Sequence, residues 1–163
     1  MNSLDSKNTM EQIDRNGMRK SIYEFSDQLK QAEEIGRSLS LGPDLAKGIN
    51  QIVFSGLGGS AIGADFIRSY LAYDVPIPIL VNRHYQLPGF VNDKTLLIVS
   101  SYSGDTEETL SALRDGLKRK ARILGISSGG ELARQAQKHA FPLIQIPAGF
   151  SPRAALGFSV IPL

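Results

Sequence analysis

The chain has no cysteine and no tryptophan, and only two histidines occur among its 163 residues. Without cysteine, a disulfide framework, a thiolate nucleophile and a cysteine-bound zinc ion are all excluded. Two histidines are too few for a histidine-rich metal site. Any chemistry must therefore come from hydroxyls, carboxylates, cationic side chains and the backbone.

The sequence also lacks a strong excess of charge and any long apolar run. The 18 Lys and Arg residues nearly balance the 16 Asp and Glu residues, so nucleic-acid binding is not expected as the main function. No run approaches the roughly 18 apolar residues of a membrane span, and no secretory signal is visible near the start. We expect one soluble, cytoplasmic domain without a membrane or nucleic-acid partner.

A helical period dominates the first part of the chain. Between Asp14 and Leu39, apolar residues recur every three or four positions, which predicts one amphipathic helix of about seven turns. The apolar positions are Met18, Ile22, Phe25, Leu29, Ala32, Ile35 and Leu39. We assign residues 1–46 to this helix and a linker, with the apolar stripe packed on the domain or on a second chain.

Short β-rich runs alternate with helical patterns in residues 47–163. Strands are predicted at 51–56, 76–82, 95–101, 121–128 and 141–147, and helices at 60–72, 106–120 and 130–139. This alternation is typical of an α/β protein, with a parallel sheet between two layers of helices. The common strand order is 2-1-3-4-5. In the helix at 60–72, we expect Ile62, Phe66, Ile67 and Tyr70 to face inward.

Two unusual loops follow the first and third predicted strands, at 55–63 and 100–108. In the order 2-1-3-4-5, these strands are neighbours at the switch point where ligands bind. In the first loop, Gly58 and Gly59 would let the backbone approach a ligand, and Ser60 opens a helix with free N–H groups. The alternative interpretation of the two glycines is a tight turn.

The second loop carries three hydroxyls, on Ser101, Ser103 and Thr106, around Gly104. Hydroxyls and N–H groups at a helix N-terminus suit a phosphate monoester. The alternative for Ser103 and Thr106 is helix capping. The first loop does not match the dinucleotide fingerprint, because its third glycine is misplaced, and no G-K-[ST] motif is present. NAD binding and ATP hydrolysis are therefore not expected.

The two loops, GLGGSAIG (56–63) and VSSYSGDTEETL (99–110), resemble those of the sugar isomerase (SIS) domain. Residues 18–163 as a whole resemble the amino-terminal half of bifunctional phosphoglucose/phosphomannose isomerases. Further matches are RHYQLP (83–88), ISSGGEL (126–132) and IPAGFSPRAALGF (146–158), of which the PRAALG segment is the most specific.

The resemblance implies a three-layer α/β/α SIS domain with an extra amino-terminal helix, in a dimeric enzyme. That enzyme interconverts glucose 6-phosphate or mannose 6-phosphate with fructose 6-phosphate through a cis-enediol, without a metal or organic cofactor. Arg153 would lie near the enediolate and stabilise its developing charge. The residues that would hold the phosphate are Gly58, Gly59, Ser60, Ser101, Ser103 and Thr106.

The chain departs from the family pattern in two respects. Asp105 stands where the family has a neutral residue, and its carboxylate would repel phosphate unless it turns outward. The family's Glu base and His come from a second SIS domain, which these 163 residues do not contain. No residue matches either one, since His84 and His139 are expected at the surface, and helix-dipole stabilisation explains Glu107 and Glu108.

Three hypotheses for this chain remain open. It is half of an isomerase from a truncated gene or a fragment, an isomerase whose base comes from another subunit, or a non-enzymatic sugar-phosphate sensor. The apolar ending SVIPL favours the first hypothesis. The amino-terminal stripe and the apolar tail also predict a homo-oligomer, dimeric or larger. The tail residues are Leu156, Phe158, Val160, Ile161 and Leu163. The preferred sugar epimer stays open.

Overall fold

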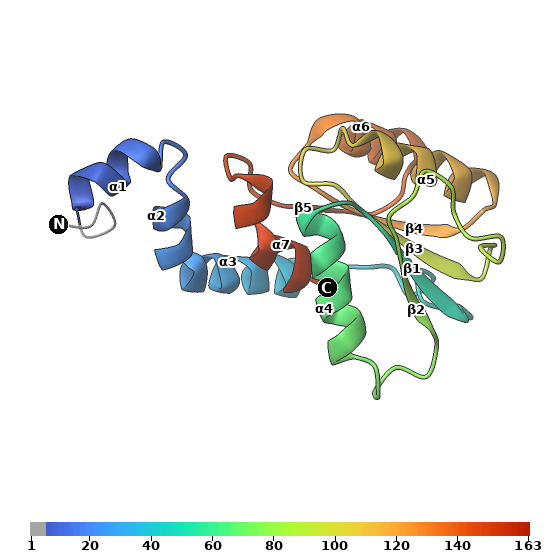
Figure 1. Ribbon diagram of the computed structural model, residues 1–163. Coiled ribbons are helices and arrows are strands. Elements are labelled where there is room, and N and C mark those ends of the chain that lie inside the picture. The colour runs from blue at the N-terminus through green and yellow to red at the C-terminus, as the bar shows by residue number, and fades with distance from the viewer. Residues whose placement is uncertain (1–5) are drawn as a thin grey trace.

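A five-stranded parallel sheet forms the centre of the computed structural model, which describes residues 6–163 (Figure 1). The strands are β1 (Gln51–Ser55), β2 (Ile79–Asn82), β3 (Thr95–Ser100), β4 (Arg122–Ser127) and β5 (Leu143–Gln145). Their order in the sheet is 2-1-3-4-5, and every pair is parallel. The predicted fold class and strand order are therefore confirmed.

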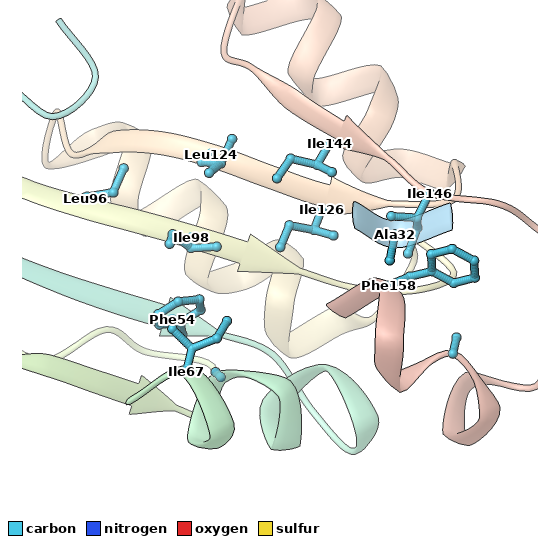
Figure 2. Packing of buried hydrophobic residues seen from close by; sticks show 12 residues of the cluster. Ala32, Phe54, Ile67, Leu96, Ile98, Leu124, Ile126, Ile144, Ile146 and Phe158 are labelled. Atoms are coloured by element: carbon cyan, nitrogen blue, oxygen red, sulfur yellow. The ribbon is translucent and has the colours of Figure 1, made fainter. Parts of the chain in front are cut away.

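Helices cover both faces of the sheet. The helices after the first strand are α4 (Gly59–Tyr70), α5 (Glu107–Lys118), α6 (Gly130–His139) and α7 (Leu156–Val160), with a 3₁₀ turn η2 (Pro152–Ala154) before α7. On one face, Leu113 of α5 and Leu132 of α6 pack against the sheet. On the other, α4, α7 and the amino-terminal helix α3 (Phe25–Ser38) bury a second core around Phe158, part of which is shown in Figure 2.

The central position of strand β3 in the sheet explains why its sequence is almost continuously apolar. It lies between β1 and β4, and all six of its residues are buried. Leu97 and Val99 point into the core beneath α5 and α6, whereas Leu96 and Ile98 point into the core beneath α4 and α7. A strand that is covered on both faces needs apolar residues at both its odd and its even positions.

The predicted single helix from Asp14 to Leu39 is wrong. Helix α1 (Lys7–Ile13) comes first, and α2 (Met18–Tyr23) is separated from α3 by a break at Glu24. The carboxylate of Asp14 accepts hydrogen bonds from the N–H groups of Met18 and Arg19, both at 2.8 Å, and so caps α2. The break at Glu24 was not visible in the sequence, because the apolar period continues across it from Ile22 to Phe25. Residues 1–5 of the predicted amino-terminal unit lie outside the described residues.

Only the second half of the amino-terminal stripe packs on the domain. Ala32 is fully buried, and Ile35 and Leu39 contact the same core. Ile22, in contrast, is 67% exposed, and Phe25 also reaches the surface. In Figure 1, α1 and α2 extend away from the sheet. Within residues 6–163, no helix is both long and apolar enough to cross a membrane.

The predicted inward face of α4 is also mostly wrong. Ile67 is buried, but Ile62, Phe66 and Tyr70 are 48%, 56% and 82% exposed. Apart from Ile67, the buried residues of α4 are small, because α7 packs closely there: a Cβ on Gly63 would lie 2.5 Å from the Ser159 hydroxyl. The helical period was correct, but the smaller side chains face inward.

Candidate functional site

The loops that follow β1 and β3 lie side by side, as the strand order predicted. Ser55 at the end of β1 pairs with Val99 of β3. Just beyond, the backbones nearly touch, since a Cβ on Gly56 would lie 2.9 Å from the carbonyl oxygen of Ser100. Helices α4 and α5 both begin at this edge of the sheet. Their first N–H groups therefore lie at the same edge, and the start of a helix attracts anions.

The two glycines of the first loop have different roles. Gly58 has φ +54° and ψ −125°, a conformation that residues with a side chain rarely adopt. Gly59 is needed for space, because a Cβ there would lie 2.9 Å from the carbonyl oxygen of Pro152. Ser60 is partly buried in the first turn of α4. The tight-turn interpretation fits Gly58. Gly59 lacks a side chain and so lets the PRAALG segment pack against its backbone.

Ser101 and Thr106 organise the second loop from inside. Ser101 is 1% exposed, and its Oγ lies 2.8 Å from Thr106 Oγ1. The same Ser101 Oγ accepts a hydrogen bond from Gly104 N–H at 3.1 Å. Thr106 occupies the N-cap position of α5, yet its hydroxyl makes no capping hydrogen bond. The capping interpretation therefore does not describe Thr106, whose side chain closes the loop instead.

Ser103 is the exposed hydroxyl of the second loop. Its Oγ accepts a hydrogen bond from the N–H of Asp105 at 3.2 Å, and the side chain otherwise faces solvent. Ser101 and Ser103 thus differ in availability, although the sequence places them two residues apart. An incoming anion would meet Ser103 before it met Ser101.

Asp105 turns toward α6. Its Oδ1 accepts a hydrogen bond from the N–H of Glu131 at 2.8 Å, in the first turn of α6. The carbonyl of Gly104 accepts a second one, from the N–H of Leu132 at 2.9 Å. The carboxylate is therefore engaged as a helix cap, which favours negative charge there. The carboxylate therefore has its partner on α6, at the surface of the domain.

Arg153 lies on the turn η2, beside the first loop. Its Cα is 3.9 Å from where a Cβ on Gly59 would stand. The side chain is exposed, and in the described part of the chain its guanidinium forms no salt bridge. The structure therefore brings Arg153 to the edge where the two loops meet, with its charge free for a ligand.

A third loop, absent from the predicted site, reaches the same edge. Tyr85 belongs to the RHYQLP segment after β2 and lies beside Glu107 and Glu108 at the start of α5. Partial desolvation of this half-exposed side chain, then the negative charges of Glu108 and Glu107, raise the pKa of the Tyr85 phenol. The position of RHYQLP directly after β2, the neighbour of β1, was the signal that could have found it. His84 and His139 are exposed, as predicted.

The described residues include no group of three or more His, Cys, Asp or Glu side chains that could hold a metal ion. The site is instead built from glycines, hydroxyls, helix N-termini and one arginine. Such donors suit an anion with several oxygens.

The fold and its strand order match those of a sugar isomerase (SIS) domain. A scan against protein-family models finds no match. The resemblance to bifunctional phosphoglucose/phosphomannose isomerases is confirmed: the sequence is 48% identical to that of Caldicellulosiruptor bescii over 146 residues, 90% of this chain and 43% of the relative. The Thermoplasma acidophilum enzyme of the same name is 37% identical over 150 residues, 90% of this chain and 44% of its own.

The solved structures support the same fold. Tagatose-6-phosphate ketose/aldose isomerase from Escherichia coli matches with a TM-score of 0.58 and 18% identity, over 88% of this chain and 42% of the other. At this identity the likeness shows the fold alone. The chain spans a little under half the length of the two relatives named above.

Proposed function

We propose that this chain is the sugar-phosphate-binding SIS domain of a phosphoglucose/phosphomannose isomerase. The full enzyme would interconvert glucose 6-phosphate or mannose 6-phosphate with fructose 6-phosphate. One observation carries the proposal: the first loop, the second loop and the Arg153 turn converge at one edge of the sheet. The 48% identity to an enzyme of that name supports it.

The phosphate would bind where α4 and α5 begin. From the first loop, the backbone N–H groups of Gly58 and Gly59 and the hydroxyl of Ser60 would contact it, and from the second loop the Ser103 hydroxyl. Charge-assisted hydrogen bonds of this kind are about twice as strong as neutral ones. Ser101 and Thr106, which are bonded to each other, would fix the shape of the second loop.

Arg153 would stabilise the negative charge that develops on the enediolate. It cannot remove the proton from carbon, because a guanidinium stays protonated. The base must lie within hydrogen-bond reach of the proton that moves between C2 and C1 of the sugar. Among the described residues near the two loops, Asp105 caps α6, and Glu107 and Glu108 form the first turn of α5. We therefore assign the base to a second SIS domain, outside these 163 residues.

The outward face of α4 suits an interface with another domain or chain. Ile62, Phe66 and Tyr70 lie on successive turns and are all exposed. Apolar faces of this kind commonly mark interfaces. We propose a homo-oligomer. At a protein concentration of roughly tens of micromolar, at which even weakly associating subunits assemble, sedimentation should show a dimer or a larger species. A clean monomer at that concentration would contradict it. A cytoplasmic location stays a prediction.

Enzyme assays test the proposed function. We expect the 163-residue chain to give no turnover of fructose 6-phosphate to glucose 6-phosphate in a coupled assay, because general-base catalysis is missing, a contribution of about 10²–10⁴-fold. A longer version that carries a second SIS domain should be active. Robust turnover by the short chain, abolished by Arg153→Ala, would mean that the base lies in this chain or in an identical subunit.

A further inference from the structure

We propose that Tyr102 is a positioning residue that ties the second loop to the turn carrying Arg153, with Gln28 holding the other end of that turn. The inference rests on the proposed function, since it links the position of Arg153 to the loop that is proposed to bind the phosphate. It concerns two side chains that no step of the isomerisation uses directly.

Tyr102 is fixed to the second loop through its backbone. It lies between Ser101 and Ser103, and its carbonyl oxygen accepts hydrogen bonds from the N–H and the hydroxyl of Ser128, at 3.0 and 2.6 Å. Gly104 adds a steric constraint, because a Cβ there would lie 1.9 Å from the carbonyl oxygen of Gly129. The loop after β4 thus holds the Tyr102 backbone in place.

The Tyr102 side chain reaches a segment far away in sequence. Its hydroxyl donates a hydrogen bond to the carbonyl oxygen of Pro147 at 3.1 Å and accepts one from the N–H of Phe150 at 2.7 Å. These two bonds span the loop that leads from β5 toward Arg153. The Phe150 ring packs edge-on against Phe158, with ring centroids 5.4 Å apart, so the segment is anchored on the core at this point.

Gln28 holds the turn from its other end. It lies on α3, is only 4% exposed, and uses both ends of its carboxamide. Its Nε2 donates to the carbonyl oxygen of Ala154 at 2.7 Å, and its Oε1 accepts from the N–H of Gly157 at 2.8 Å. A buried polar side chain whose donor and acceptor are both paired specifies one geometry. The amino-terminal helix therefore contributes directly to the placement of Arg153.

Three elements thus fix the backbone on either side of Arg153: the second loop through Tyr102, α3 through Gln28, and the first loop through the contact of Gly59 with Pro152. The Arg153 side chain is itself exposed, so its backbone position sets where its charge can reach. Small displacements of a catalytic charge have large effects on rate. Tyr102 connects the phosphate-binding loop to that position.

Amide NMR of the 163-residue chain tests the tie. The variants are Tyr102→Phe, which removes only the hydroxyl, and Tyr73→Phe as the matched control at a fully exposed tyrosine. In Tyr102→Phe, the exchange protection of the Phe150 amide should fall by roughly fivefold or more, the effect of losing about one hydrogen bond. Tyr73→Phe should leave it unchanged. Gln28→Met should lower the exchange protection of the Gly157 amide in the same way, because that N–H donates to Gln28 Oε1.

Titration with fructose 6-phosphate gives the functional readout. In the wild type we expect amide shifts in both loops and also in residues 150–155. In Tyr102→Phe the loop shifts should persist, while those of 150–155 fall to less than half. Unchanged protection of Phe150, or unchanged shifts at 150–155, would overturn the proposal for Tyr102. If fructose 6-phosphate shifts neither loop in the wild type, the proposed function fails instead, and the exchange measurement still decides whether the tie exists.

Discussion

The two loops of the site are held in shape by opposite means. The loop after β3 is held by polar side chains: Ser101 bonds to Thr106, and Asp105 to the start of α6. The loop after β1 depends on missing side chains, at Gly58 for its backbone conformation and at Gly59 for contact with Pro152. The loop after β3 is therefore held by its own side chains, whereas the loop after β1 is shaped by its contact with the segment that contains Arg153.

The largest effect should come from Gly104→Ala, compared with Gly58→Ala. Both positions have positive φ, +80° and +54°, but only Gly104 also lacks space, with 1.9 Å from an added Cβ to Gly129 O. We expect Gly104→Ala to lose roughly 3 kcal/mol or more of unfolding free energy, and Gly58→Ala about 1–2 kcal/mol. Urea unfolding followed by circular dichroism measures both. The reverse order would show that the second loop yields more easily than its hydrogen bonds imply.

Ser101→Ala and Ser103→Ala should separate framework from ligand contact. Loss of the buried Ser101 hydroxyl leaves the Thr106 hydroxyl without its partner and removes one of the two acceptors of the Gly104 N–H, which should cost about 1–3 kcal/mol of stability. Ser103→Ala should leave stability unchanged and weaken fructose 6-phosphate binding by about 1.5–3 kcal/mol. Calorimetric titration and urea unfolding of both variants decide the matter. Equal affinity of wild type and Ser103→Ala would remove that residue from the site.

Asp105→Asn should have the smallest effect, because the carboxylate caps α6 rather than facing the phosphate. An amide oxygen can still accept the hydrogen bond, so only the interaction of charge with the helix dipole is lost, about 0.3–1 kcal/mol. Affinity for fructose 6-phosphate should stay within about twofold of the wild type, since the carboxylate is exposed and its charge is screened by solvent and salt. A large gain in affinity would mean that Asp105 faces the ligand in solution.

The sequence was sufficient for the sheet and for the position of the two loops. Continuous apolar runs such as β3, separated by helical patterns, lead to one strand order, and that order places the loops together. The face of α4 could not be predicted in the same way. Its inward face is set by the close approach of α7 at Gly63, a contact between residues distant in sequence. A helical period identifies a helix, but tertiary packing selects the face that is buried.

The orientation of single polar side chains was likewise out of reach. Asp105 could have faced a ligand or a helix, and only the position of α6 decides between them. Asp14 lies within a helical pattern, yet its carboxylate competes for the first N–H groups of α2 and ends the preceding helix. Tyr102 stands within a recognised motif, but its partners, Pro147 and Phe150, come from another segment.

The central claim is that the two loops bind one phosphate group together. Amide NMR of the wild-type chain, titrated with fructose 6-phosphate and then with unphosphorylated fructose, tests it most directly. We predict saturable shifts centred on residues 58–60 and 103–107 with the phosphorylated sugar, and none with fructose. Shifts confined to one loop, shifts centred on other residues, or equal responses to the two sugars would contradict the claim.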